Sequence, residues 1–485
     1  MLTLLLMLAA QAEPWVPPGT FERIEVAKLI QPQDCTATRC DWSPALERAQ
    51  AMMDDVPSPQ FAFRLPGGHF MLPCGAGNLS QPLVLRRPHT LEGCGGTFPG
   101  ATTLLNALHT EAPAITISES AHGFALRHFY LTTLVGATSN ERHGVLIRAR
   151  GDIEEVSIRG AFVDGFHIFG DHSAPGNPNV NGAKIRGGRV DLVERYALFQ
   201  KGQDANANTI ESLDVGANCK KGTSRAEILA TTTGWSRSNG IITVFLDPPA
   251  NLKAGRFVQF RTASGQFPSG PVLAVAPAAP ALTTSLTIAV PGPNSALSVE
   301  TGDLHRPCAN IFDESFLGNN YFAIQTATAK DTTTGEVFRS YVLAGVAARS
   351  VCMGCYAEDD QLKGYLSPLA SVIGAVSGWE GPGFRMEGRR VNGIKAVGMP
   401  ATGDTIAPEL WIGGNDWGPP GTVLTMMPPQ SGSSAPTYTA LRWRMNNKSW
   451  YSDIASSGTA VSQRISTEAA KLAVTITRSS TVVKP

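Results

Sequence analysis

The sequence predicts an all-β protein built as a parallel β-helix, a solenoid in which each turn of the chain stacks on the next. Short apolar strands recur, Gly or Asn turns separate them, and no long amphipathic helix stands out among the 485 residues. The recurring runs are Gly144–Ile147, Gly165–Phe169, Tyr196–Phe199 and, after a long interruption, Asn310–Phe312. The first three start 21 to 31 residues apart. That spacing is too short for strand–helix–strand units and suits coils that bury their apolar side by stacking.

The segment before the coils predicts a helical cap within residues 13–112. Ser43 is a good N-cap and Pro44 suits the first helical turn, while Leu46, Ala49 and Met53 fall on one helical face. Such a helix covers the open end of a solenoid, as a terminal repeat must.

The coils are expected over residues 113–222 and 308–400, with a small β domain inserted at 223–307. Asn239-Gly240 is a hairpin signal between two strand-like runs of that insertion. Residues 401–485, which carry four tryptophans, are expected to form a β-rich C-terminal region.

Charge restricts the partners. The chain has 40 Lys and Arg against 40 Asp and Glu, and no basic run. This balance argues against nucleic acid or an anionic membrane as partner.

The N-terminus predicts export. Residues 1–12 resemble a secretory signal peptide that ends in Ala10-Gln11-Ala12, and no later stretch is long and apolar enough to span a membrane. Eight cysteines fit a secreted or extracellular protein, the cell surface included. Local spacing suggests the bridges Cys35–Cys40 and Cys74–Cys94. Cys219 and Cys308 stand at the base of the predicted insertion and are expected to form a third bridge, and Cys352 and Cys355 are expected to be buried thiols or structural bridges.

A family resemblance adds to the fold prediction. The matching positions are Asp41, Ala45-Leu46, Ala49, Leu65–Phe70, Leu91–Gly96 and Thr102–Leu104. In this order they resemble the opening of pectate-lyase-like right-handed parallel β-helix proteins. The superfamily includes lyases, glycosidases, epimerases, phage tailspikes and non-enzymatic surface proteins. Its known catalytic sequence sets are absent here, so the resemblance implies a fold and no catalytic residue.

Alignment of the apolar strands predicts where side chains share a column. Three columns are expected: Ile147, Ile168, Leu198 and Ile311; Arg148, Phe169, Phe199 and Phe312; Arg150, Asp171, Lys201 and Glu314. Asp171 and Glu314 would lie two coils, or about 9–10 Å, apart with Lys201 between them. A carboxylate pair of that kind suits an inverting glycosidase, and the same trio suits a lyase in which carboxylates hold calcium. The alternative is a ladder of paired charges on a solvated sheet.

Other polar groups are weaker candidates. Glu358, in the acidic run 358–360, is a possible catalytic acid, and the predicted substrate-binding residues are His172, Asp204, Asp313 and Trp417. Asp164 and His167 lie close to His172 in the sequence, and a histidine can transfer protons near neutral pH. Residues 204–208 suit either a sugar or metal site or an Asn ladder that caps turn backbone groups. The phenylalanine column is expected to stack in the core.

These features predict an exported β-helix that binds, and in one version cleaves, an extracellular polysaccharide, as a lyase or a glycoside hydrolase. The alternative is a non-catalytic surface, adhesion or structural protein. No cofactor is specified by the sequence, although calcium is compatible with the carboxylates.

Overall fold

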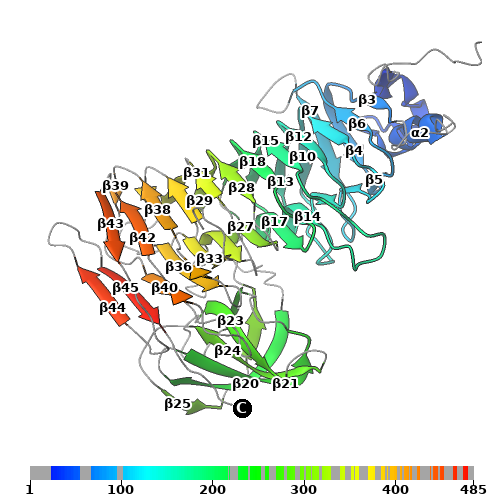
Figure 1. Cartoon of the computed structure of the whole chain (residues 1–485). Helices are drawn as coiled ribbons and strands as arrows, with labels where there is room; N and C mark the ends of the chain where they lie inside the picture. Colours follow the sequence, from blue (N-terminus) through cyan, green and yellow to red (C-terminus); the bar gives the residue numbers. More distant parts are fainter. Residues whose placement is uncertain are drawn as a thin grey trace, which may run out of the picture.

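The computed structural model describes residues 23–54, 67–95, 102–216 and 218, strands and some turns between 228 and 306, and residues 309–315 and 319–328. From residue 339 to 478 it describes the backbone of strands only. The predicted signal peptide, residues 1–12, lies outside the described residues. Figure 1 shows an elongated solenoid with the helix α2 (Ser43–Asp54) at its N-terminal end and a separate β unit against its side.

Three long sheets run along the solenoid, and consecutive strands of the chain pass from one sheet to the next. Sheet A contains β1 (Arg23–Glu25), β3 (His69–Met71), β6 (Thr90–Glu92), β9 (Phe124–Arg127), β12 (Gly151–Glu154), β15 (Lys184–Arg186), β18 (Thr209–Glu211), β28 (Asn320–Phe322), β31 (Val351–Met353), β34 (Phe384–Glu387), β38 (Glu409–Gly413), β42 (Leu441–Met445) and β43 (Lys448–Ser452). Sheet B contains β2 (Cys40–Asp41), β4 (Gly75–Leu79), β7 (Thr103–Ala107), β10 (Phe129–Thr133), β13 (Ser157–Gly160), β16 (Arg189–Asp191), β19 (Asp214–Val215), β29 (Gln325–Thr328) and β32 (Tyr356–Asp359). Sheet C contains β5 (Leu83–Leu85), β8 (Ile115–Ile117), β11 (Val145–Ile147), β14 (Asp164–Phe169), β17 (Tyr196–Gly202), β27 (Ala309–Ser315), β30 (Arg339–Ala344), β33 (Ala370–Val376), β36 (Ile394–Pro400), β40 (Val423–Met426), β45 (Ala473–Arg478) and β44 (Ser462–Ser466).

Neighbouring coils pair in parallel, which confirms the predicted parallel β-helix. Only the terminal pairs β42–β43 and β44–β45 of these sheets are antiparallel among the described strands. The ladders cross residue 400 without interruption, because β36 pairs with β40 and β40 with β45. Two short parallel pairs accompany them, β35 (Arg390–Val391) with β39 (Asp416–Trp417) and β37 (Thr405–Ile406) with β41 (Thr437–Tyr438). The domain boundaries remain predictions.

The core consists of stacked columns of apolar side chains. In sheet B the inward column is Leu105, Leu131, Ile158, Val190 and Val215, all almost fully buried. Each such side chain contributes about 1.5–3 kcal/mol by its removal from water. Because alternate residues of a strand face opposite sides, these columns also fix which residues face outward.

The N-terminal end is capped as predicted. The helix α2 spans Ser43–Asp54, and Leu46, Ala49 and Met53 are buried. The short 3-10 helices η1 (Val26–Leu29) and η2 (Pro32–Asp34) precede it. No helix among the described residues is both long and apolar enough to traverse a membrane.

Two predicted disulfides are present, Cys35–Cys40 and Cys74–Cys94. The predicted Cys219–Cys308 bridge lies outside the described residues, as does Cys355. Only the backbone of Cys352, in β31, is described.

The insertion is a small antiparallel barrel between β19 and β27. Its strands are β20 (Ile228–Ser238), β21 (Ile241–Ala250), β22 (Phe257–Phe260), β23 (Ser269–Ala276), β24 (Thr283–Ala289), β25 (Ser295–Ser298) and β26 (Gly302–His305). Pairing runs β21–β24–β23–β22–β26–β20 and returns to β21, with β25 added to β20. The barrel has its own core, which includes Val244, Phe260 and Ile288. Ser238 pairs with Ile241 across the Asn239-Gly240 position, as the hairpin signal predicts.

The predicted columns of sheet C contain a two-residue error. In the structure Ile168 pairs with Gln200, and Leu198 pairs with Phe166. The prediction matched apolar residues to one another, but the interior position opposite Ile168 holds the buried polar side chain of Gln200. Lys201 therefore pairs with Phe169, not with Asp171, whereas the predicted pairing of Lys201 with Glu314 is confirmed.

Candidate functional site

The outer face of sheet B carries polar side chains in two columns along the solenoid. One column contains Tyr130, Ser157, Arg189 and Asp214; the other contains Asn78, Asn106, Thr132, Arg159 and Asp191. Inward residues between them, such as Leu131 and Val190, pack in the core, which turns these polar neighbours outward. Adjacent coils are about 4.8 Å apart, so each side chain can contact the next one in its column.

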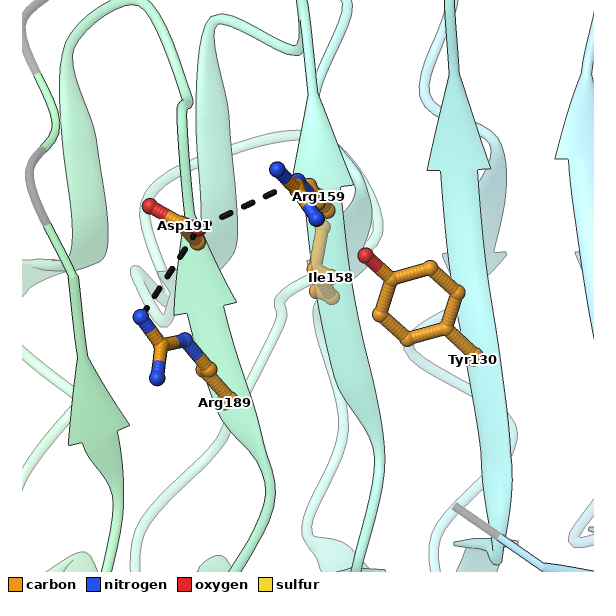
Figure 2. Close-up of a pocket in the computed structure, with 5 residues that line it drawn as sticks. All are labelled: Tyr130, Ile158, Arg159, Arg189 and Asp191. Carbon is orange, nitrogen blue, oxygen red and sulfur yellow. Dashed lines mark ion pairs between the residues drawn. The ribbon is translucent and has the colours of Figure 1, made fainter. Parts of the chain in front are cut away.

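A pocket of about 280 Å³ lies on this face, lined by Tyr130, Ile158, Arg159, Arg189 and Asp191. Figure 2 shows the Tyr130 ring on β10, the Arg159 side chain on β13 and the ion pair partners on β16. Asp191 Oδ2 lies 3.8 Å from Arg159 Nε and 3.9 Å from Arg189 Nη2. The carboxylate thus sits between two guanidinium groups.

Both guanidinium groups reach the surface, and Arg159 also hydrogen-bonds the Tyr130 side chain. The Arg159 and Arg189 side chains are 46% and 49% exposed, and their separations from Asp191 are longer than hydrogen bonds. Arg189 Nη1 does donate to Asp214 Oδ2 at 2.9 Å. Each guanidinium has five donors, so both can still bind a ligand oxygen.

Tyr130 forms the aromatic wall of the pocket. Burial of the ring raises the pKa of Tyr130, although the positive charge of Arg159 opposes this shift. The Tyr130 side chain therefore offers a half-buried aromatic ring and a neutral hydroxyl group. An aromatic ring with a hydroxyl, two guanidinium groups and one carboxylate can stack on and hydrogen-bond a polyhydroxylated ligand.

The predicted residues Asp171, His172 and Asp204 lie together in exposed turns that follow β14 and β17. Asp171 Oδ1 accepts hydrogen bonds from the backbone N and the Oγ of Ser173, at 2.9 and 2.6 Å. Asp204 Oδ2 lies 2.8 Å from His172 Nδ1 and accepts from the His172 backbone N. In the described contacts these groups close turns, and their roles in catalysis or binding remain predictions.

Glu314 and Asp313 face opposite sides of β27. Glu314 accepts two hydrogen bonds from Arg306, at 2.9 and 2.8 Å, where the barrel returns to the solenoid; the Arg306 side chain is buried and the Glu314 side chain is 9% exposed. Asp313 is inside the solenoid, where Tyr321 and Asn319 donate to its Oδ2 at 2.7 and 2.9 Å. These contacts stabilise the fold. The predicted catalytic role of Glu314 and the predicted substrate-binding role of Asp313 remain predictions.

Two further predicted residues are described only by their backbone. Glu358 lies on β32 of sheet B, opposite Ala327 of β29, and Trp417 lies on β39, opposite Val391. Both assignments remain predictions.

The predicted Asn ladder is present. Asn181 Oδ1 accepts from the Asn206 backbone, and Asn208 Oδ1 accepts from the Ala183 backbone, at 2.8 and 2.7 Å. Asn319 Oδ1 continues the series by accepting from the Asn208 backbone. These amides satisfy turn groups of successive coils.

Two members of the predicted phenylalanine column, Phe199 and Phe312, are buried but lie outside the solenoid core. Phe199 and Phe312 pair across β17 and β27 with ring centroids 5.7 Å apart, whereas Phe169 pairs with Lys201. Leu198 and Ile311, adjacent in sequence, occupy the core instead. The expected core stack is therefore wrong: the two rings form a second layer on the outer side of sheet C, beneath Arg306, whose guanidinium lies 5.6 Å from the Phe199 ring.

A buried charge cluster adjoins this layer. Asp164 accepts two hydrogen bonds from Arg195, at 2.7 and 2.6 Å, and lies 3.0 Å from His167 Nδ1 and 3.1 Å from His143 Nδ1. Burial alone raises the pKa of Asp164, but Arg195 and His143 outweigh it and hold that pKa well below its usual value. Burial and the neighbouring His143 lower the pKa of His167 to about 4.

The pKa of His143 moves in the opposite direction. Burial lowers it, but the charge of Asp164 and the hydrogen-bonding groups of Asp164 and Glu141 outweigh burial and raise it above its usual value. The pKa values of these two adjacent imidazoles therefore shift in opposite directions, and His143 Nε2 also lies 3.7 Å from Glu141 Oε2.

The sheet B pocket was missed by the sequence prediction, which followed the strands of sheet C. A signal was nevertheless present, since polar residues alternate with apolar ones at 130–132, 157–159 and 189–191. That period of two marks a half-buried strand, but which coils bring these strands together depends on the register.

Comparison with known proteins gives distant structural likenesses. No family model and no curated protein sequence matches this chain. Among solved structures, ORF18 of Geobacillus virus E2 is 12% identical with a TM-score of 0.38, over 91% of this chain and 66% of that one. The catalytic domain of a GH87 alpha-1,3-glucanase in complex with nigerose is 11% identical with a TM-score of 0.37, over 90% and 66%. The pre-mature gene product 12 of bacteriophage phi29 is 8% identical with a TM-score of 0.32, over 90% and 58%. The chain thus spans just under two thirds of the first two structures.

Proposed function

We propose that this protein binds an extracellular polysaccharide along the outer face of sheet B, with the Tyr130 pocket as its central contact. The carrying observation is the placement of an aromatic ring beside two exposed guanidinium groups that share one carboxylate. Carbohydrates are held by such combinations, because the ring covers an apolar sugar face while charged groups hydrogen-bond the hydroxyls.

The shape of the face supports an extended ligand. The polar columns run over the successive strands β7, β10, β13, β16 and β19, so an outward polar position recurs from coil to coil. A linear polymer can contact several coils at once, and several weak contacts then add to a useful affinity.

Binding, without cleavage, is the function that these contacts support best. The two described carboxylates of the pocket region, Asp191 and Asp214, are both engaged by arginine. Binding without cleavage is also what the non-catalytic alternative expected from the sequence, a surface or adhesion protein, requires of this face.

The test compares two matched pairs of arginines. Arg159 and Arg189 flank Asp191 on sheet B, and Arg127 and Arg186 flank Glu154 on sheet A at 3.8 and 3.7 Å. Wild type, the double variant Arg159→Ala/Arg189→Ala and the control Arg127→Ala/Arg186→Ala are titrated with neutral and acidic polysaccharides by calorimetry.

We expect the sheet B variant to bind at least tenfold more weakly than wild type, as for the loss of a central contact worth about 1.4 kcal/mol or more, with the control unchanged. Tyr130→Ala is expected to behave like the sheet B variant. Equal affinity of all variants, or no binding of any polysaccharide by wild type, contradicts the proposal. Released reducing ends or unsaturated products in the same samples extend binding to hydrolase or lyase activity.

A further inference from the structure

A second site candidate lies in the buried cluster on the outer side of sheet C. His143 precedes β11, Asp164 and His167 belong to β14, and Arg195 precedes β17, so the cluster joins three successive coils. Its members are largely removed from water: Asp164 is fully buried, and the His143 and His167 side chains are 1% and 12% exposed.

The donor atoms of this cluster have the spacing of metal ligands. One ligand atom from each of His143, Asp164 and His167 lies within 4.8 Å of the others. Asp164 Oδ2 is 3.1 Å from His143 Nδ1 and 3.0 Å from His167 Nδ1. A tetrahedral ion with bonds of about 2.0–2.1 Å requires neighbouring donors roughly 3.3 Å apart, so only small shifts separate this arrangement from a coordination sphere.

His143 lies between two carboxylates, Asp164 and Glu141, but its ring nitrogens are poorly aligned with both. Among the described residues, neither of its ring nitrogens makes a hydrogen bond, although the ring is almost completely buried. Its Nδ1 approaches Asp164 Oδ2 closely but without hydrogen-bond geometry. A buried nitrogen without an aligned hydrogen-bond partner is a group for which a native fold needs an explanation, and a bound ion supplies one here.

Glu141 supplies the second shell of such a site. Glu141 Oε2 lies 3.7 Å from His143 Nε2, on the side of the ring away from Asp164. Histidines that bind a metal through one nitrogen present the other to a carboxylate, which fixes the tautomer and leaves the ligating lone pair directed at the metal. Glu141 is largely exposed, so it can serve this role without itself being a core residue.

Arg195 is compatible with a metal at this place. Its Nε donates to Asp164 Oδ1, the oxygen that faces away from the two imidazoles, while its Nη2 contacts Oδ2. A metal on Oδ2 displaces only the Nη2 contact, and the Nε contact then orients the carboxylate from behind. The cluster has two carboxylates, Asp164 and Glu141, against the one guanidinium of Arg195.

We propose that His143, His167 and Asp164 bind one divalent transition-metal ion, such as Zn²⁺, that ties the residue before the start of β11 to β14. Two imidazole nitrogens with one carboxylate oxygen suit zinc, cobalt or nickel and do not suit calcium or magnesium, which prefer oxygen ligands only. The buried position makes the ion structural.

The experiment uses the full chain stripped with a chelator and then dialysed against Zn²⁺, Co²⁺ or Ca²⁺ alone. We expect equimolar retention of Zn²⁺ and Co²⁺ by elemental analysis, no retention of Ca²⁺, and the visible absorption of tetrahedral Co²⁺. His167→Gln is expected to abolish retention and the cobalt spectrum.

The exposed second-shell residue keeps the test decisive if the core variant fails to fold. Glu141→Gln is expected to fold normally and to weaken Zn²⁺ binding by about 10–100-fold. The control is His69→Gln/His128→Gln. These two histidines flank Glu92 of sheet A in a second His–carboxylate–His group, in which His128 Nδ1 lies 3.6 Å from Glu92 Oε1. No Zn²⁺ retention by folded wild type overturns the proposal, as does unchanged affinity in Glu141→Gln or loss of the metal in the control.

Discussion

At the scale of the residue, Asp191 organises the sheet B pocket. Its carboxylate keeps Arg159 and Arg189 on the same side of the face, while Arg189 is also held by Asp214. The carboxylate needs space beside the next coil, and Gly216 provides it: a Cβ at that position would lie 2.5 Å from Asp191 Oδ1.

Gly216→Ala is therefore expected to displace Asp191 and to separate the two guanidinium groups. We expect polysaccharide affinity to fall about fivefold or more, the ~1 kcal/mol that distinguishes contributing contacts from neutral ones. Titration calorimetry against the best-binding polysaccharide measures the change.

The control for this substitution is Gly136→Ala, since a Cβ at Gly136 meets no atom within 4 Å. Unchanged affinity in Gly216→Ala, with the fold intact by circular dichroism, would show that the position of Asp191 does not matter for binding.

At the scale of the element, the interior of β17 contains a polar network that fixes its register. Gln200 is fully buried, donates to Tyr321 Oη at 2.6 Å and accepts from Asn208 Nδ2 at 3.0 Å. Tyr321 in turn donates to Asp313. The network spans the inside of the solenoid between sheets C and A.

Gln200→Leu is expected to lower the free energy of unfolding by about 1–3 kcal/mol, because Tyr321 and Asn208 each lose a buried partner. Urea denaturation followed by circular dichroism measures this change. Gln203→Leu, at an exposed position of the following turn, is the control and is expected to have little effect. A stabilised Gln200→Leu protein would mean that the network serves no structural purpose.

The same network explains how far the sequence alone could predict the fold. Periodic apolar strands, the Ser43 helix and the Asn239-Gly240 hairpin each have local signals, and each is present in the structure. Register has no such signal when a polar residue fills an interior position, because Gln200 reads as outward-facing in an apolar pattern. The error at Gln200 placed Asp171 in a column that it does not share.

The pocket could be predicted even less well. Its four polar residues come from three coils, and only the pairing of Thr132 with Arg159 and of Arg159 with Asp191 brings them together. Glu314 shows the converse case: its placement next to Lys201 was predictable, but its partner Arg306 comes from the end of the insertion.

At the scale of the whole molecule, the barrel is fastened to the solenoid through Arg306. Figure 1 shows the barrel strands on the side of the solenoid where sheet C lies. The bidentate pair with Glu314 and the contact of the guanidinium with Phe199 lie at this junction, and Arg306 is almost completely buried.

Glu314→Gln is expected to destabilise this junction by about 3–5 kcal/mol, because it leaves a buried guanidinium without its carboxylate. Hydrogen exchange should increase in β26 and β27 while exchange in β10 and β13 stays unchanged. The control is the sheet B variant Arg159→Ala/Arg189→Ala, which should leave the junction intact and hydrogen exchange in β26 and β27 unchanged.

Polysaccharide binding should persist in Glu314→Gln, because the sheet B pocket is built by other coils. Loss of binding in this variant, with exchange in β10 and β13 unchanged, would move the site from sheet B to the junction.

The central claim, that the ligand lies on sheet B, is tested most directly on the wild-type protein by arginine modification. The Arg159 and Arg189 side chains are 46% and 49% exposed, and those of Arg127 and Arg186 on sheet A are 38% and 45% exposed. All four are therefore expected to react with phenylglyoxal at similar rates in the absence of polysaccharide. Mass spectrometry of peptides then gives the reaction rate at each arginine with and without saturating polysaccharide. The account predicts that polysaccharide slows modification at Arg159 and Arg189 and leaves Arg127 and Arg186 unaffected. Equal rates with and without polysaccharide at Arg159 and Arg189, or protection confined to Arg127 and Arg186, would contradict it.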